Sequence, residues 1–202
     1  MSLTSDLRIA LHEVGVALRR PEEFTTRWRD RRLTPGPRPL IFPVLLANAV
    51  LGIAAYGLVM RLHEGWDGML GGLVKAPVAA GLAWALALPA LYILNSALGS
   101  KLDASTTLLA ALTTVSFGSM ALMASIPITW FFGLALPYGL VRLAVNLLVF
   151  VGVGICMVDV FLRTMKALEP AHSRAYATLW LALVGVIGAE LMTLFSLFHF
   201  DA

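Results

Sequence analysis

Six polar residues in or beside the long apolar stretches of this sequence could carry chemistry, among them Asn48 and Asn95, and four of them form the candidate site: Arg142, Asn146, Asp159 and Glu190. Inside a lipid bilayer, a charged side chain is costly unless it faces water, a partner or a compensating group. Glu190 needs an explanation first, because it lies roughly 13 Å inside the end of the last apolar stretch at about 1.5 Å per helical residue. Two interpretations are open: a structural pair that joins two helices, or a functional site that binds protons or a partner.

We expect the structural pair. If the last two apolar stretches run antiparallel, Arg142 and Asn146 come from the same half of the membrane as Glu190 and can reach it. Asp159 has a candidate partner nearer in sequence, because Arg163 follows it by four residues and such pairs share one face of a helix. The four polar residues therefore form a candidate intramembrane polar site.

A catalytic interpretation starts from Glu22, Glu23 and Arg27. Their spacing resembles the Glu-Glu-x-x-x-Arg pattern of the CAAX-type intramembrane proteases, which implies further histidines inside later membrane spans. The four histidines of this chain all lie outside the spans that we predict: His12, His63, His172 and His199. We therefore expect no enzyme activity, no catalytic residue, no haem or other cofactor, and no metal site.

The composition shows which elements must position these residues. The chain has 202 residues, of which 59% are hydrophobic and 13% are charged, and its mean hydropathy is +0.83. So little charge excludes an ordinary soluble domain and a large catalytic domain outside the membrane. We predict an all-α polytopic membrane helix bundle with five transmembrane helices, at about residues 40–60, 76–98, 105–126, 143–162 and 176–198.

Small residues predict where these helices touch. Alanines recur every four residues at Ala79, Ala83 and Ala87, and Gly185 and Ala189 lie beside Glu190. Helices in lipid associate through close backbone approach, so both stripes are candidate helix contacts. The single cysteine, Cys156, lies in an apolar stretch, and we expect it to pack in the bundle.

The basic residues predict the orientation. With the N-terminus in the cytoplasm, twelve of the Lys and Arg residues lie on the cytoplasmic side and three on the opposite side. Positively charged loops are retained in the cytoplasm, so we expect the N-terminus inside and the C-terminus outside. Since the basic residues lie at the membrane ends, the pI near 9.4 does not indicate a nucleic-acid partner.

Residues 1–39 form the predicted cytoplasmic N-terminal segment. Apolar residues recur at helical spacing over about residues 5–20, and Pro21 then starts a second helix with Glu22 and Glu23 in its first turn. An amphipathic helix of this kind lies on a membrane surface, or packs on the ends of the spans or on a partner. We expect a membrane-surface segment formed by Leu7, Leu11, Leu18, Phe24, Trp28, Arg31 and Arg32.

Three short runs resemble the Yip family of polytopic membrane proteins that interact with Rab GTPases. They are the Arg-Pro-Glu-Glu-Phe run at residues 20–24, the Leu-Asn-Ser-Ala-Leu-Gly-Ser-Lys run at 94–101, and the Thr-Thr-Leu-Leu-Ala run at 106–110, followed by Pro127. The resemblance implies a five-span fold and a trafficking, membrane-shaping or assembly role. It transfers no site residue to this chain.

Together these observations indicate a non-enzymatic integral membrane protein with an organising, trafficking-like or assembly role, such as an accessory subunit or scaffold. The alternative is a small transporter or channel-like subunit that uses Glu190 as a protonatable site. We expect the lipid bilayer as its surroundings, and other membrane-protein subunits or a second copy of the chain as partners. Arginine outnumbers lysine 12 to 3, which is typical of a GC-rich bacterium and favours the bacterial inner membrane.

Overall fold

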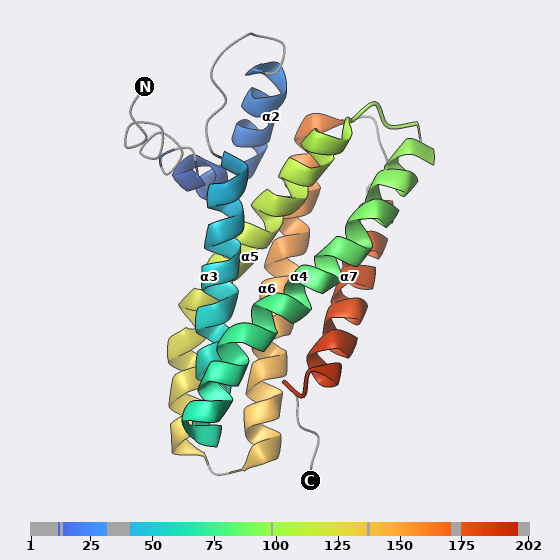
Figure 1. Cartoon of the computed structure of the whole chain (residues 1–202). Coiled ribbons are helices and arrows are strands. Elements are labelled where there is room, and N and C mark those ends of the chain that lie inside the picture. The colour runs from blue at the N-terminus through green and yellow to red at the C-terminus, as the bar shows by residue number, and fades with distance from the viewer. Residues whose placement is uncertain are drawn as a thin grey trace.

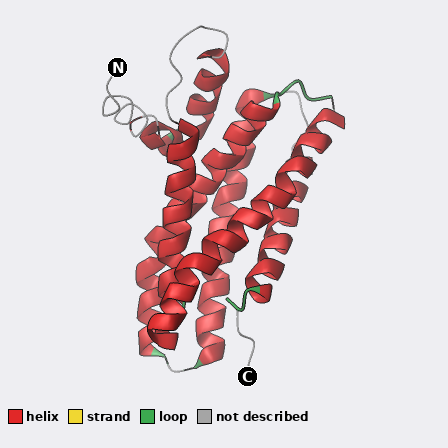
Figure 2. Cartoon of the chain, viewed as in Figure 1, coloured by secondary structure: helices red, strands yellow, loops and turns green. Residues whose placement is uncertain are grey.

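A computed structural model describes residue 12 and residues 14–31, 41–97, 99–136, 138–170 and 175–197, and these parts of the chain are almost entirely helical (Figures 1 and 2). The elements in chain order are α2 (Pro21–Arg31), α3 (Ile41–Met60), the short 3-10 helix η1 (Leu62–Glu64), α4 (Gly65–Ala97), α5 (Ala104–Ala135), α6 (Gly139–Leu168) and α7 (Ala175–Leu194). Helices α3 to α7 run alternately in opposite directions, and α2 lies at the end where α3 begins (Figure 1). The expected all-α bundle is confirmed.

Four of these helices are long and apolar enough to cross a membrane, counted over the described residues: α3, α4, α5 and α6. Helix α7 contributes a shorter apolar stretch, Thr178–Leu194. Many large apolar side chains of these helices are exposed on the outside of the bundle, for example Leu51 and Leu148. Such a surface fits contact with a lipid bilayer rather than with water.

Two connections between the predicted spans are wrong. The spans leave residues 61–75 as a connection, but η1 and the first turns of α4 occupy them. The spans also leave residues 127–142 as a connection, but α5 continues through Pro127 to Ala135 and α6 begins at Gly139. Proline is tolerated inside helices in lipid because neighbouring hydroxyls and helices can satisfy the carbonyl that loses its N–H partner. The connections are therefore shorter, and the helices longer, than apolarity alone predicts.

Glycines let α3 approach its two neighbours closely. A Cβ atom added at Gly57 would clash with the carbonyl oxygen of Gly72 in α4, and one added at Gly72 would clash with that of Gly57. A Cβ atom at Gly52 would lie 2.8 Å from the Cβ atom of Ser119 in α5. Close backbone approach of this kind is the usual way for helices to associate in lipid. Helix α3 is therefore held between α4 and α5.

Helix α4 leans from α3 at one end of the bundle toward α7 at the other (Figure 1). Ala79, Ala83 and Ala87 are buried, and a Cβ atom added at Gly188 of α7 would lie 3.9 Å from that of Ala83. The indole Nε1 of Trp180 in α7 donates a hydrogen bond to the carbonyl oxygen of Ala87 at 2.7 Å. The alanine stripe is confirmed as a helix contact within the chain.

Three other small residues do not pack as expected. Gly185 and Ala189 are exposed on α7, and no atom of a neighbouring element lies within 4 Å of a Cβ atom added at Gly185. Cys156 is exposed on α6. Gly185 and Ala189 therefore face outward rather than into the bundle, because the inner face of α7 is formed by Trp180, Val184 and Met192. The expectation that Cys156 packs in the bundle is wrong.

The α3–α4 contact predicts the effect of a single methyl group. Gly57→Ala should lower the free energy of unfolding by about 1–3 kcal/mol, the usual cost of overpacking, because the new Cβ atom meets backbone that cannot move aside. Gly152→Ala in α6 is the matched control, since nothing lies within 4 Å of its added Cβ atom, and it should be neutral or slightly stabilising. Denaturant titration in detergent measures both variants. Equal stabilities would contradict the contact.

Candidate functional site

Helix α2 packs its aromatic face against the bundle. Phe24 is 1% exposed and Trp28 is 8% exposed, and both belong to an apolar cluster that includes Ile41 and Leu45 of α3 and Leu109 of α5. The ring centroids of Trp28 and Phe42 lie 5.5 Å apart in an edge-to-face arrangement. The spacing of four residues that places Phe24 and Trp28 on one helical face thus serves a protein contact.

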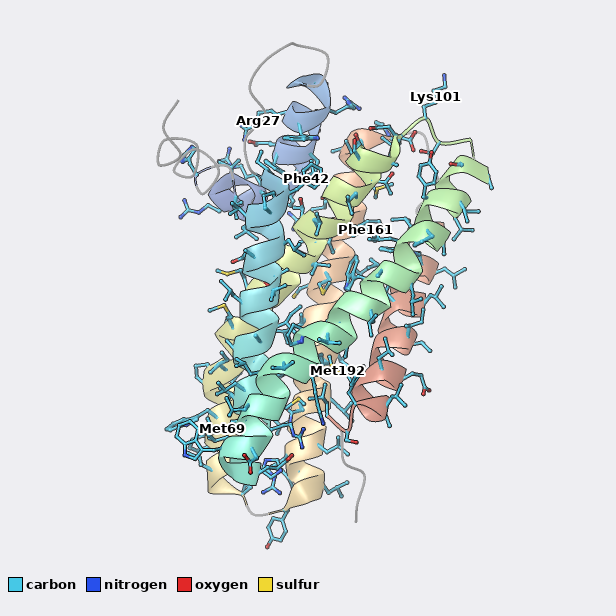
Figure 3. All side chains as sticks on the ribbon, viewed as in Figure 1. Arg27, Phe42, Met69, Lys101, Phe161 and Met192 are labelled. Atoms are coloured by element: carbon cyan, nitrogen blue, oxygen red, sulfur yellow. The ribbon has the colours of Figure 1, made fainter. Side chains whose placement is uncertain are left out.

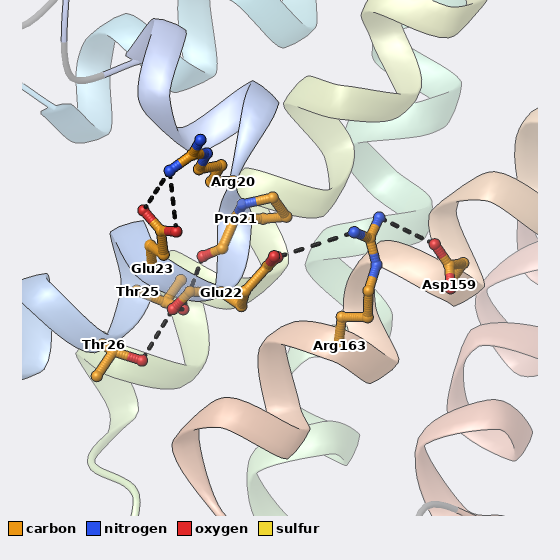
Figure 4. A network of polar contacts seen from close by, with 8 residues as sticks. All are labelled: Arg20, Pro21, Glu22, Glu23, Thr25, Thr26, Asp159 and Arg163. Atoms are coloured by element: carbon orange, nitrogen blue, oxygen red, sulfur yellow. Dashed lines mark hydrogen bonds and ion pairs between the residues drawn. The ribbon is translucent and has the colours of Figure 1, made fainter.

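Ion pairs and hydrogen bonds join α2 to the end of α6 (Figure 4). The Nη2 atom of Arg163 lies 2.9 Å from Oδ2 of Asp159, and its Nη1 atom lies 3.9 Å from Oε2 of Glu22. Arg29 of α2 donates from Nη1 to the carbonyl oxygen of Leu168 at 3.0 Å. The i,i+4 pair of Asp159 and Arg163 is therefore confirmed, and it extends to α2.

The motif that resembles a protease pattern is part of this contact. Glu23 pairs with Arg20 at 3.2 Å on the exposed side of α2, whereas Glu22 faces Arg163. Thr25, which lies between the motif's glutamates and Arg27, is buried and donates its hydroxyl to the carbonyl oxygen of Pro21 at 2.9 Å. The Thr25 hydrogen bond stabilises the first turn of α2, and the Glu22 ion pair attaches α2 to α6.

The membrane-surface expectation is wrong for Phe24 and Trp28, because both pack on apolar residues at the ends of α3 and α5. Leu18 is half-buried against the same cluster. Three further residues of that expectation lie outside the described residues: Leu7, Leu11 and Arg32. Arg31 is the last residue of α2, and its side chain is not among the described ones.

Tyr56 is the centre of a buried hydrogen-bond network between three helices. Its hydroxyl donates to Oδ1 of Asn146 in α6 at 2.9 Å and accepts from Oγ1 of Thr129 in α5 at 3.1 Å. All three side chains are buried. Because the bilayer offers no water to these groups, each one needs a partner inside the bundle. Asn146 is therefore a structural residue, with a partner different from the one expected.

A second network joins α3 to α5. The Nδ2 atom of Asn48 donates to Oγ of Ser116 at 2.7 Å, and Oγ of Ser119 donates to the carbonyl oxygen of Asn48 at 3.2 Å. Sequence reasoning missed Tyr56, Thr129 and these serines as partners. A signal was present, because many hydroxyl residues of α5 fall on its buried face: Thr106, Thr107, Thr113, Thr114, Ser116, Ser119 and Thr129.

Glu190 does not meet Arg142 or Asn146. Its side chain is exposed on α7, and the structure places no hydrogen bond or ion pair between it and any described residue. Arg142 instead donates from Nη1 to the carbonyl oxygen of Leu136 at 3.5 Å. The expected pair is wrong because Met192 faces the core, and two residues along a helix turn the side chain by about 200°. Glu190 consequently faces the outside of the bundle.

The described residues also enclose an apolar groove of about 520 Å³ between α3, α4 and α5. Its walls include Leu46 and Val50 of α3, Gly81 and Ala85 of α4, and Leu112 of α5. By contrast, the hollow beside Arg142, Asn146 and Thr129 holds only about 10 Å³. Over the same residues, the structure contains no cluster of three or more His, Cys, Asp and Glu side chains that could hold a metal ion.

The packing of α2 predicts that its attachment to the bundle depends more on the apolar contact of Phe24 than on the ion pair with Arg163. Phe24→Ala should release α2, because truncation of a buried phenylalanine costs about 3–5 kcal/mol in protein cores. Arg163→Gln should release it little, since half-exposed ion pairs contribute about 1 kcal/mol or less. The rate of tryptic cleavage after Arg27 in detergent, followed by mass spectrometry, measures the release of α2 in the two variants. Faster cleavage in Arg163→Gln than in Phe24→Ala would refute the apolar attachment.

The Tyr56 network predicts an energetic coupling. Tyr56→Phe should lower the free energy of unfolding by about 1 kcal/mol, because hydrogen bonds between membrane helices contribute about 0.6–1.7 kcal/mol. Asn146→Ala should cost less in the Tyr56→Phe background than alone, which a double-mutant cycle measures. The exposed Tyr92→Phe is the control and should change stability by less than about 0.5 kcal/mol. Strict additivity of the Tyr56 and Asn146 changes would show that this bond is absent.

Comparisons of the chain with protein-family models, curated proteins and solved structures found no match. The resemblance to the Yip family therefore stays an expectation from the three sequence runs. The geometry of the described residues is the basis for the proposals that follow.

Proposed function

We propose that this chain is a non-enzymatic, five-span integral membrane protein that acts in assembly, as an accessory subunit that contacts a partner membrane protein through the outer face of α7. The observation that carries the proposal is Glu190, an exposed carboxylate about one turn before the end of α7 on a largely apolar helix. A carboxylate that faces lipid is costly, and a donor on a partner helix removes that cost.

The small residues of α7 support the same surface. Gly185 and Ala189 are exposed next to Glu190, and small residues allow a second helix to approach closely. Asn48, Tyr56 and Asn146 each hydrogen-bond to a neighbouring helix, whereas Glu190 makes no such contact with a described residue. This contrast favours a partner contact over a protonatable site in the transporter alternative, in which the carboxylate would face the interior.

The five-span topology and the orientation belong to the same proposal. The 20 residues of α7 reach about 30 Å as a helix, which matches the apolar thickness of a bilayer. Helix α2 and the last turn of α7 lie at opposite ends of the bundle (Figure 1), as an odd number of crossings requires. The distribution of basic residues favours the α2 side as cytoplasmic, in a bacterial inner membrane. The trafficking or membrane-shaping role implied by the Yip resemblance is one form of this assembly function.

Photo-crosslinking in native membranes tests the surface. A crosslinking amino acid at Val186 of α7 should give a discrete protein adduct, whereas one at Val151 of α6 should give none, although the two side chains are 61% and 58% exposed. Glu190→Ala should abolish the adduct, because it removes the acceptor that the partner needs. Thr193→Val, at an exposed position one turn along, should leave it intact.

Three results would overturn the proposal. The first is an adduct from Val186 that is unchanged in Glu190→Ala. The second is crosslinking to lipid alone at both positions. The third is ion or solute flux into liposomes that contain the purified chain, if this flux disappears in Glu190→Gln, because it would establish the transporter alternative.

A further inference from the structure

We propose that the groove between α3, α4 and α5 holds one acyl chain of an anionic phospholipid from the leaflet beside α2, and that Arg27 binds its headgroup. This proposal is independent of the partner contact at α7, because the groove and α2 supply all its residues.

The lining of the groove determines what can enter it. Its volume of about 520 Å³ lies within the roughly 300–1,000 Å³ range of ligand sites. Every residue that lines it is apolar, from Phe42 to Ile53 on α3, Pro77 to Leu88 on α4 and Leu108 to Val115 on α5. The indole N–H of Trp84 is the one side-chain donor among these lining residues, so the part of the occupant inside the groove is mainly hydrocarbon.

The position of the groove favours lipid as the source of that hydrocarbon. Leu46, Val50 and Gly81 line it and are also exposed, so the groove opens to the outside of the bundle where the bilayer lies. A transmembrane helix is about 10–12 Å across with its side chains, so it would lie on the opening rather than within it. A single acyl chain is narrow enough to enter.

Helix α2 lies at one end of the groove. Phe42 lines the groove, and its ring centroid lies 5.5 Å from that of Trp28 in α2. Trp28 is 8% exposed, and protein atoms cover its Nε1 atom, so its ring is a packing contact rather than a donor to a ligand. The exposed residues of α2 next to Trp28 are therefore the ones that can meet a lipid headgroup at this end of the groove.

Charge selects the headgroup. Arg27 precedes Trp28, is exposed, and has no acidic partner among the residues that the structure describes. Figure 3 shows Arg27 on α2 at the same end of the bundle as Phe42. A guanidinium beside an interface attracts anionic headgroups and binds phosphate oxygens through charge-assisted hydrogen bonds. The occupant is therefore an anionic rather than a zwitterionic phospholipid.

Native mass spectrometry of the full chain in mild detergent tests the proposal. Phosphatidylglycerol and phosphatidylcholine with identical acyl chains are titrated separately, and the fraction of protein with one bound lipid gives each apparent Kd. Phosphatidylglycerol should bind about tenfold more tightly, which is the contribution of one charge-assisted contact. Arg27→Gln should remove this preference.

A bulky residue in the groove is the decisive variant. Gly81→Trp should weaken the binding of both lipids about tenfold or more, because the indole replaces buried methylene groups of the lipid. Gly152→Trp on α6 is the matched control, since an added Cβ atom meets nothing within 4 Å at either glycine. It should bind both lipids like the parent. Ala85→Phe, at another exposed lining position, repeats the test if Gly81→Trp unfolds.

Three results would overturn the proposal. The first is that Gly81→Trp and Ala85→Phe bind phosphatidylglycerol as tightly as Gly152→Trp. The second is equal binding of the two lipids by the parent. The third is a co-purifying protein that is lost in Gly81→Trp while lipid binding persists, which would assign the groove to a protein partner.

Discussion

The close approach of α3 and α4 at Gly57 and Gly72 is the constraint on which the rest of the structure depends. The two backbones can touch there only because neither residue has a Cβ atom, so the helices meet at one end of the bundle. Helix α4 then leans away toward α7, where Ala83 and Ala87 pack. The same divergence leaves the apolar groove between α3 and α4, with α5 as its floor. One contact thus produces both the packing of α7 and the hollow that we assign to lipid.

The absence of water in a bilayer explains how the polar residues are distributed. Tyr56 and Asn48 each hydrogen-bond to neighbouring helices, so the polar groups inside the bundle stabilise it. Glu190 follows the opposite pattern, because it is a charge on the outer face of a helix whose inner face is apolar. A polar residue that the fold does not use is the natural place for a partner to bind, which is the basis of the proposed assembly function.

Helix α2 is packed on the bundle and also borders the groove that we assign to lipid. Its buried aromatic residues Phe24 and Trp28 attach it to the bundle, whereas Arg27 is exposed. Trp28 packs on Phe42, which lines the groove. A helix attached in this way presents charge to a leaflet without depending on that leaflet for its position. This arrangement differs from a free amphipathic helix, which needs the membrane surface to fold.

The sequence by itself determined the helical class, the approximate position of each apolar helix, the alanine stripe of α4 and the pair of Asp159 and Arg163. These features depend on composition or on spacing within one helix, which the chain carries locally. The tertiary structure alone decided which way each helix faces: that Phe24 and Trp28 face protein, that Asn146 meets Tyr56, and that Gly185, Cys156 and Glu190 face outward. In lipid, both faces of a span are apolar, so hydrophobic periodicity does not distinguish the inner face from the outer one. Rotation about the helix axis is then determined by contacts between residues far apart in sequence, such as Gly57 with Gly72.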